Sequence, residues 1–342
     1  MIRTGRIISI AVLLTPFLVM AIVEYFAMPE ITSENKTVDI IIPRGASINA
    51  ILDTLLINNL IDDKKVFRFW ITTLEKDRSL KAGYYEIPLG LNNPQLVNYL
   101  STARSKQLKV TLIEGWRIEQ IAHALDAKLD IDSSVFVALA RDKKFISNLG
   151  INKSSLEGYL LPDTYFMYWG MDEQQLIRFL VKNCKNIFTD KLIARIDSMK
   201  MSMHKILTLA SIIEGEAIFD DERSTISSVY HNRLRKRIKL GADPTIQYIL
   251  DGPPRRLLYR DLEIDSPYNT YKYYGLPPGP INNPGKNSIL AAIYPADTNY
   301  LYFVARGDGR HTFSYNAKEH DKAKAKFNQI RREVRRNKKK SN

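Results

Sequence analysis

The chain has little of the chemistry on which metal centres and disulfide-stapled proteins depend. Among its 342 residues there is one cysteine, Cys184, and there are only five histidines. One cysteine excludes an internal disulfide framework and any cysteine-based metal site, although it does not exclude an extracytoplasmic location. The sequence also lacks a phosphate-binding P-loop, a dinucleotide-binding glycine fingerprint and a Gly-x-Ser-x-Gly nucleophile elbow. We therefore expect a protein that uses no metal and no cofactor.

Acidic residues are in deficit as well. Lys and Arg number 50 against 37 Asp and Glu, which gives a formal net charge of +13. Much of this excess lies at the C-terminus, because the chain from Lys318 onward holds 11 Lys or Arg against three acidic residues. Such a segment can bind nucleic acid, anionic lipid or anionic wall polymer, or it can be a solvated end. The solvated end is the simplest interpretation, and we predict a basic flexible tail over residues 331–342.

Long apolar runs are also scarce, and the clearest one lies near the N-terminus. Ile7–Val23 is uncharged, and about 17 residues is at the short end of what crosses a bilayer. Arg3 and Arg6 precede it, so the positive-inside rule places residues 1–6 in the cytoplasm. A cleaved signal peptide is the alternative, but no clear small-x-small cleavage site follows. We predict a single-pass anchor over 7–26 with the rest of the chain outside the cytoplasm, which argues against nucleic acid as a partner.

A strand–helix–helix–strand pattern follows the predicted anchor. Val38–Ile42 is typical of a strand, Ser47 of a helix N-cap, and Gly83–Pro88 of a returning strand. Small modules of this order resemble LysM domains, which bind the N-acetyl sugars of glycan chains, and residues 42–51 carry the resemblance. A structural spacer is the alternative. We predict a LysM-like module over residues 37–105.

The same pattern recurs further along the chain. At a constant offset of 70 residues, Gly45 matches Gly115 and Ile51 matches Ile121. Ile48, Leu55 and Ile61 of the first copy likewise match Ile118, Leu125 and Ile131 of the second. We interpret this as a duplicated strand–turn–helix unit. The alternative is that any two strand–helix units share glycine turns and Ile/Leu stripes.

One helix in the second half combines a buried pattern with two carboxyls. Leu207–Ala217 is apolar almost all round, as in a helix inside a domain, until Glu214 and Glu216. At helical spacing Glu214 falls on the same stripe as Ala210, so it is either desolvated or lines a cavity. Burial raises the pKa of a carboxyl, which suits acid–base catalysis near neutral pH. The structural alternative is a glutamate paired with an arginine such as Arg233.

Segments rich in proline, glycine and polar residues follow this helix later in the sequence. The density of both residues between Gly275 and Gly285 specifies an ordered loop, and long ordered loops are usually functional. Gly241–Tyr248 is typical of a turn that carries hydrogen-bonding groups. Asn232 and Arg233 lie in the helix that follows the carboxyl-bearing one, from which we expect them to reach toward Glu214.

An ordered set of short motifs identifies a family resemblance. The motifs are Glu157-Gly158-Tyr159, Pro162-Asp163-Thr164-Tyr165, Ala210-Ser211-Ile212-Ile213-Glu214, Asn232-Arg233-Leu234, Asp243-Pro244-Thr245, Tyr268-Asn269-Thr270-Tyr271, Gly275-Leu276-Pro277-Pro278-Gly279, Pro284-Gly285 and His311-Thr312-Phe313. Together they resemble the YceG-like (MltG) endolytic murein transglycosylases of bacteria over about residues 37–330. With the patterns above, the resemblance predicts an α+β fold with an N-terminal transmembrane helix, the small LysM-like α/β module and a larger mixed α+β catalytic domain over 106–330.

The resemblance implies a peptidoglycan lyase. Such an enzyme cleaves the bond between N-acetylmuramic acid and N-acetylglucosamine in nascent strands without water, leaves a 1,6-anhydro end and terminates strand elongation. The catalytic glutamate of the family falls on Glu214. We expect the protonated Glu214 to protonate the glycosidic oxygen and then, as a carboxylate, to take the proton of the C6 hydroxyl that attacks C1. One residue acting twice would replace the two carboxyls of ordinary glycosidases.

Polar and aromatic residues of the motifs are the candidate substrate-binding residues. They are Glu157, Asp163, Thr164, Asn232, Arg233, Asp243, Thr245, Gln247, Tyr268, Asn269 and Tyr271. Glu216 is left out of the catalytic set because helical geometry turns it about 200° away from Glu214. Gly215 and Ala217 depart from the Lys and Thr that relatives often carry, which leaves subsite detail open.

The expected partners and location follow from the anchor and the resemblance. The partners are peptidoglycan glycan strands, the cytoplasmic membrane and cell-wall synthases, with no nucleic acid. The expected location is the bacterial cytoplasmic membrane, with the catalytic domain on the outer or periplasmic side. Two alternatives stay open, namely a hydrolase that uses Glu214 with Glu216 or Asp163, and a wall-binding scaffold without catalysis.

Overall fold

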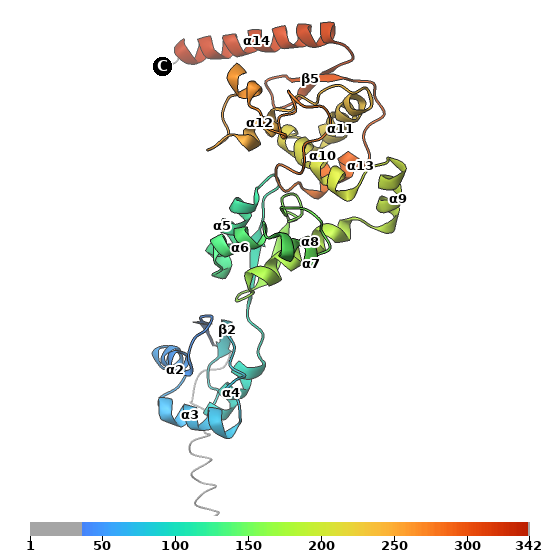
Figure 1. Ribbon diagram of the computed structural model, residues 1–342. Helices are drawn as coiled ribbons and strands as arrows, with labels where there is room; N and C mark the ends of the chain where they lie inside the picture. Colours follow the sequence, from blue (N-terminus) through green and yellow to red (C-terminus); the bar gives the residue numbers. More distant parts are fainter. Residues whose placement is uncertain (1–35, 341–342) are drawn as a thin grey trace, which may run out of the picture. The chain divides into compact units, whose positions relative to one another are not determined.

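The computed structural model describes residues 36–340, which form two compact units (Figure 1). The first unit holds the chain up to Lys109 together with residues 128–130 and 166–171. The second unit holds the remainder. The sequence places the boundary of its two predicted domains at residues 105–106, and in the structure the chain leaves the first unit at Lys109.

The predicted α+β class is correct, but the transmembrane helix that the prediction included is not found in the described part of the chain. Within residues 36–340, no helix is both long and apolar enough to cross a bilayer. Helix α14 (Ala317–Lys340) has 24 residues, a sufficient length, but its many Lys and Arg residues would make a bilayer position costly. The predicted anchor over 7–26 and the cytoplasmic residues 1–6 lie outside the described residues.

The first unit is a strand pair with three helices. Its elements are β1 (Thr37–Ile42), α2 (Ile48–Ile57), α3 (Lys64–Thr73), β2 (Gly83–Pro88) and α4 (Asn93–Thr102). The strands β1 and β2 pair antiparallel with Ile40 opposite Tyr85, and both side chains are buried. Alternate residues of a strand face the same side, so this register directs one face of the pair into the core. Ser47 accepts a hydrogen bond from Ala50 N, which confirms the predicted cap of α2.

A second set of elements repeats the order of the first. It comprises β3 (Gln107–Thr111), α5 (Ile118–Leu129), α6 (Ser133–Leu139), α7 (Lys143–Asn148) and β4 (Thr164–Tyr168). β3 pairs with β4 as β1 pairs with β2. Gly45 and Gly115 both have positive φ angles, 70° and 78°, which glycine adopts without strain. Ile51 and Ile121 are both buried. The two predicted copies therefore share strand order, turn conformation and core positions, with α7 as an addition in the second.

Helix α10 is the centre of the second unit. The remaining elements are α8 (Glu173–Ile187), α9 (Asp190–Ser198), α10 (Met203–Glu216), α11 (Asp220–Arg235), α12 (Asp243–Ile249), η1 (Tyr259–Glu263), α13 (Lys286–Ile293), β5 (Tyr302–Ala305) and β6 (His311–Ser314). Every residue from Ile206 to Ile213 is buried, as predicted for a helix that is apolar all round. α10 packs against α11, α12 and α13 (Figure 1). Glu214 therefore follows directly on a fully buried stretch.

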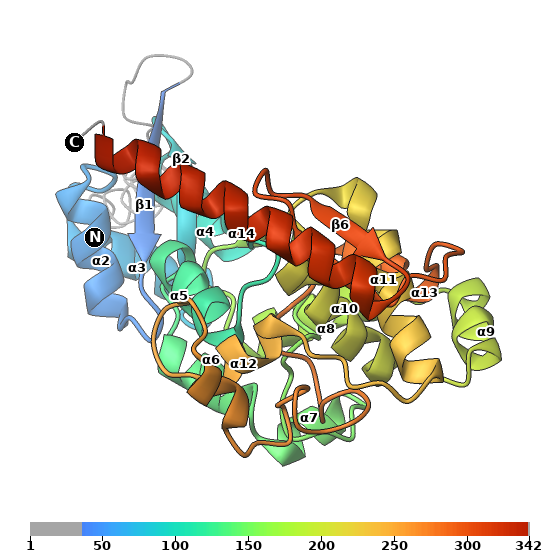
Figure 2. The same cartoon turned by 90° about the horizontal axis from the view of Figure 1, so that it is seen from above.

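Two segments differ from or extend the predicted local structure. Residues 241–248, predicted as a turn, mostly form helix α12 from Asp243 onward. Pro244 is compatible with this because the first turn of a helix needs no donor from its backbone nitrogen. α14 packs along the β5–β6 hairpin (Figures 1 and 2) and continues to Lys340, through the segment for which the sequence predicts a flexible tail.

Candidate active site

Glu214 is held at both of its carboxylate oxygens. Its Oε1 accepts a hydrogen bond from Arg223 Nη1 at 3.0 Å, and its Oε2 accepts one from the backbone nitrogen of Gly285 at 3.0 Å. The side chains of Glu214 and Arg223 are only 6% and 7% exposed. Arg223 also donates to Asp220 Oδ1 at 2.8 Å and to Ser288 Oγ. The pairing alternative from the sequence is thus realised, but with Arg223 in place of Arg233.

The proline- and glycine-rich loop reaches Glu214 because it is bonded to α10. Ile281 N donates to Ser211 Oγ at 3.0 Å, and Asn282 Nδ2 donates to Ser211 O at 2.9 Å. Ser211 lies one helical turn before Glu214, so these bonds hold the loop against the last turns of α10. Four residues after Ile281, the N–H of Gly285 donates to the Glu214 carboxylate.

Asn283 connects the same loop to two further segments. Its Oδ1 accepts hydrogen bonds from Gly158 N at 2.9 Å and Leu160 N at 3.0 Å. Its Nδ2 donates to Trp116 O at 3.0 Å and to Glu157 Oε1 at 2.8 Å. Burial raises the pKa of Glu157 to about 8. Asn283 therefore fixes the turn after β3 beside the end of α10, and Glu157 supports this framework from the interior.

That turn brings a second carboxyl, Glu114, to the Glu214 centre. Glu114 Oε2 lies 3.7 Å from Arg223 Nη2, so one guanidinium faces both carboxyls. A methyl group on Gly285 would overlap the Glu114 carboxyl, and a methyl group on Gly115 would lie 3.6 Å from Glu214 Cγ. The Glu114 side chain is 45% exposed. Its partial burial, and next the charge of Glu214, raise the pKa of Glu114.

A cavity of about 840 Å³ adjoins this centre at Gly115 and Gly215. Its other lining residues are Arg117, Glu119, Gln120, Glu216, Asp243, Pro244, Gln247, Gly252, Pro253, Pro254, Ile281 and Asn282. The volume is within the range of pockets that hold drug-sized ligands. Glu216 turns toward this cavity and accepts a hydrogen bond from Tyr230 OH at 2.9 Å. Burial raises the pKa of Glu216 to about 7.

Two of the candidate substrate-binding residues line the cavity. Asp243 begins α12 and accepts a hydrogen bond from Tyr271 OH, which places Tyr271 directly behind it. Gln247 lies one turn further on, and its backbone oxygen accepts from Arg117 Nη2 at 3.1 Å. The guanidinium of Arg117 in turn lies 4.7 Å from the ring centre of Tyr248. These side chains form a polar wall of the cavity.

Other candidates hold the surrounding loops. The Asn232 side chain donates to the backbone oxygens of residues 298 and 300, and the Arg233 side chain to those of residues 240 and 301. Thr245 is fully buried and donates to Ala242 O at 2.7 Å. Asn269 is fully buried and donates to two backbone oxygens of the preceding turn. All four side chains are engaged with the backbone of the second unit.

The remaining candidates lie outside the cavity lining. Thr164 Oγ1 is 3.0 Å from Thr111 Oγ1 across the β3–β4 pair. Asp163 is exposed, and its Oδ1 accepts from Thr164 N at 2.7 Å. The ring of Tyr268 lies 4.8 Å from that of Tyr248. Their predicted role in substrate binding stays a prediction.

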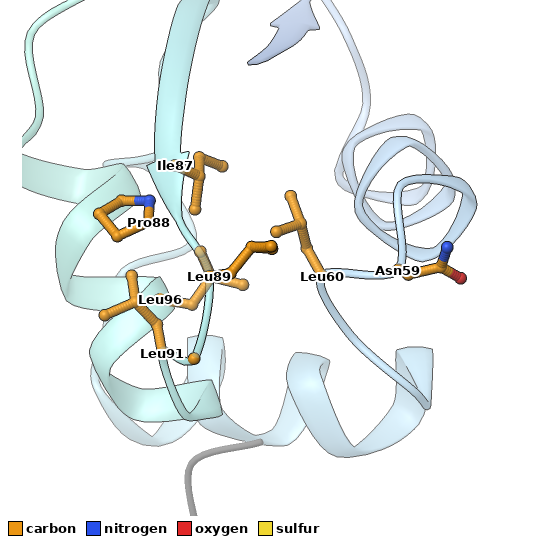
Figure 3. A pocket seen from close by; sticks show the side chains of 8 residues that line it. Asn59, Leu60, Ile87, Pro88, Leu89, Leu91 and Leu96 are labelled. Atoms are coloured by element: carbon orange, nitrogen blue, oxygen red, sulfur yellow. The ribbon is translucent and has the colours of Figure 1, made fainter. Parts of the chain in front are cut away.

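The first unit has a small hollow of its own, of about 10 Å³. Figure 3 shows the apolar side chains of Leu60, Ile87 and Leu96 around it. A space of this size holds at most one water molecule. It is therefore too small for a sugar ring.

Metal-ligating side chains do not gather in the described part of the chain. Within residues 36–340 there is no group of three His, Cys, Asp or Glu that could hold an ion. Cys184 is buried, with its Sγ 3.9 Å from Gly158 O.

Sequence patterns alone do not single out Glu114, Arg223 or the role of the Gly285 N–H. A signal for Glu114 is present in the repeat. At the offset of 70 residues that aligns Gly45 with Gly115, Glu114 stands where the first copy has Arg44. A reversal of charge beside a matched glycine marks a position where the second copy departs from the first.

The family follows from comparison with known sequences. The sequence model of the YceG-like family matches residues 40–326. The chain belongs to the YceG-like family. This confirms the predicted resemblance, and the site described above lies inside the matched region.

Named relatives of this YceG-like chain include an endolytic murein transglycosylase of Bacillus subtilis, 37% identical over 85% of this chain and 85% of the relative. An endolytic murein transglycosylase of Streptococcus pneumoniae is 28% identical over 86% of this chain, which spans 59% of that relative. The crystal structure of a yceG-like protein from Listeria monocytogenes has a TM-score of 0.59 at 35% identity and covers 84% of this chain and 98% of that one.

Proposed function

We propose that this YceG-like protein is an endolytic murein transglycosylase, a lyase that cuts the glycan strands of peptidoglycan. The relatives of that name from B. subtilis and S. pneumoniae support the activity. The observation that carries it is the position of Glu214. This carboxyl follows a fully buried helical stretch, is oriented by Arg223 and Gly285 N, and adjoins a cavity of about 840 Å³.

The reaction that fits this centre breaks the bond between N-acetylmuramic acid and N-acetylglucosamine without water. The glycosidic oxygen must gain a proton, and the C6 hydroxyl of the muramic sugar must lose one as it attacks C1. A 1,6-anhydro ring then closes and the strand ends. Glu214 is the carboxyl that we place at this proton transfer, because its burial and fixed orientation suit a reaction kept apart from bulk water.

The sugars on either side of the bond would occupy the adjoining cavity. Asp243 and Gln247, from the candidate set, line it together with Arg117 and Asn282. These side chains offer acceptors and donors for hydroxyl and acetamido groups. Pro253 and Pro254 supply apolar surface for the faces of the rings.

The biological role follows from the substrate. Cutting inside nascent strands would end their elongation, and cell-wall synthases are the partners that this role requires. Because peptidoglycan lies outside the cytoplasmic membrane, we place the catalytic unit on that side. The first unit, with its β1–α2–α3–β2 order, would serve as a LysM-like module that binds glycan.

Digestion of uncrosslinked glycan strands tests the proposal. Wild-type protein should release products with 1,6-anhydro ends, which are one water lighter than reducing ends. Glu214→Gln should abolish them, since the amide keeps the size of the side chain but neither gives nor takes the proton. Asp197→Asn, at an exposed carboxylate on α9, is the matched control and should cut at the wild-type rate. Reducing ends in place of anhydro ends would contradict the proposed reaction.

A further inference from the structure

Glu214 has little room to serve both ends of the proton transfer. Its side chain is 6% exposed, and each carboxylate oxygen already accepts a hydrogen bond, from Arg223 and from Gly285 N. A group that first protonates the glycosidic oxygen and then deprotonates the C6 hydroxyl must reach two different substrate atoms in turn. Fixed contacts at both oxygens oppose that movement.

Glu114 occupies the open side of the same centre. It is 45% exposed where Glu214 is nearly buried, and it shares the Arg223 guanidinium. Its carboxyl rests against Gly285, the residue whose N–H holds Glu214. Gly115, the next residue in the chain, lines the cavity. Glu114 thus lies beside the Glu214 centre, on its more exposed side, and is adjacent in sequence to a residue of the cavity wall.

We propose that Glu114 is a second catalytic residue, which donates the proton to the glycosidic oxygen while Glu214 takes the proton of the C6 hydroxyl. The inference rests on the proposed transglycosylase function and deepens it. As the C1–oxygen bond breaks, its electrons stay with the oxygen, which receives the Glu114 proton and leaves as a hydroxyl. The C6 oxygen forms the new bond to C1 and releases its proton to Glu214.

The proton balance closes within the pair. After the cut Glu114 is ionised and Glu214 is protonated, and transfer of one proton back to Glu114 restores the starting state. No net proton is consumed, because the proton lost by the C6 hydroxyl replaces the one given to the leaving oxygen. The two carboxyls together carry the same charge before and after, so the charge that they present to the buried Arg223 guanidinium is unchanged, and the ion pair of Arg223 with Asp220 takes no part.

The charges around Glu114 suit this role. Among the charged groups around it, Glu214 on α10 has the largest effect, followed by Arg223 and Asp220 on α11 and by Asp163 before β4. Burial and the charge of Glu214 act in the same direction and raise the pKa of Glu114, while Arg223 opposes them. A raised pKa suits a carboxyl that donates a proton, and different environments are what separate the roles of the two members of a catalytic carboxyl pair.

Two substrates separate the roles of the two carboxyls. The first is uncrosslinked glycan strands, whose sugar leaving group needs a proton. The second is a glycan oligomer with a nitrophenyl group on the terminal muramic C1, which leaves without protonation. Glu114→Gln should lower kcat on strands by at least about 100-fold, with KM within about threefold. On the nitrophenyl substrate it should retain at least about a third of wild-type activity, whereas Glu214→Gln should lose activity on both.

Conservative and matched variants complete the experiment. Glu114→Asp should recover part of the activity on strands, and Asp197→Asn should leave both activities unchanged. Equal losses by Glu114→Gln on the two substrates, or no loss on strands, would overturn the proposal for Glu114. If wild-type protein forms no anhydro ends at all, it is the proposed function that fails. If wild-type protein forms anhydro ends and Glu114→Gln cuts strands at the wild-type rate, the proposed function stands and only the role of Glu114 is overturned.

Discussion

Arg223 Nη1 lies 3.0 Å from Glu214 Oε1 across the corner at which α10 ends and α11 begins, and both side chains are almost fully buried. The pairing depends on that corner, since only three residues separate the two helices. A buried ion pair adds little net stability, because desolvation offsets most of its attraction. Its effect appears when one partner is removed and the other charge stays buried.

Arg223→Met should therefore destabilise the fold strongly. It leaves the Glu214 carboxylate buried with only one of its two hydrogen bonds, and we expect a loss of about 3 kcal/mol in the free energy of unfolding, measured by urea denaturation. Arg310→Met is the control, because its ion pair with Asp221 is exposed and should contribute less than about 1 kcal/mol. Equal losses of stability for the two variants would contradict the expectation that Arg223→Met leaves the Glu214 charge buried without its partner.

Gly285→Ala tests the contact between the loop and Glu114. Gly285 has an ordinary φ of −69°, so alanine fits the backbone, but its methyl group would collide with the Glu114 carboxyl. We expect a modest stability loss of about 1 kcal/mol, since alanine is a poorer N-cap than glycine. Activity on glycan strands should fall by about 100-fold as Glu114 is displaced.

Gly279→Ala is the matched control for that variant. The same loop carries Gly279, where an added methyl group meets its nearest neighbours, His204 and Tyr268, at 3.4 Å. This is close to ordinary van der Waals contact, so activity should change by less than about threefold. If both alanine variants lose activity alike, disturbance of the loop, not displacement of Glu114, explains the effect.

The features that the sequence predicts well depend on near neighbours in the chain. The cap at Ser47, the strand Gly83–Pro88 and the buried character of α10 follow from local propensity and period. Glu214 could be singled out because a carboxyl directly after an apolar helical stretch is unusual. The helix at Asp243 was missed because its glycine and proline resemble those of a turn.

The features that the sequence did not predict depend on how helices meet. Arg223 and Arg233 lie on the same helix, ten residues and about 15 Å apart. Periodicity cannot tell which end of α11 approaches Glu214, whereas the short connection from α10 favours the first turns. Glu114 is separated from Glu214 by 100 residues and is brought there by the hydrogen bonds of Asn283, which no local pattern encodes.

Glu216→Gln should separate substrate binding from the chemical step. Glu216 lines the cavity and accepts a hydrogen bond from Tyr230 OH, whereas Glu214 is held by Arg223 and Gly285 N. We expect KM for glycan strands to rise by about three- to tenfold, with kcat within about threefold of wild type. Steady-state kinetics measures both. A loss of kcat comparable to that of Glu214→Gln would instead place Glu216 among the catalytic residues.

Glu157 should make stability depend on pH in a defined direction. Burial raises its pKa from 4.5 to about 8 in the folded chain, so between these values the folded state holds a proton that the unfolded state has lost. The stability contribution of the neutral carboxyl is fully present below about pH 4.5 and is lost as pH rises through about 8.

Glu157→Gln removes this titration while its side-chain oxygen can still accept from Asn283 Nδ2. As pH rises from 5 to 9, the free energy of unfolding of the variant, measured with urea, should increase relative to that of wild type by up to roughly 4 kcal/mol. Comparison at each pH cancels the titration of Glu216, which both proteins share. Parallel stability curves for the two proteins would mean that Glu157 is ionised in the folded chain and that its contact with Asn283 is made by a charged carboxylate.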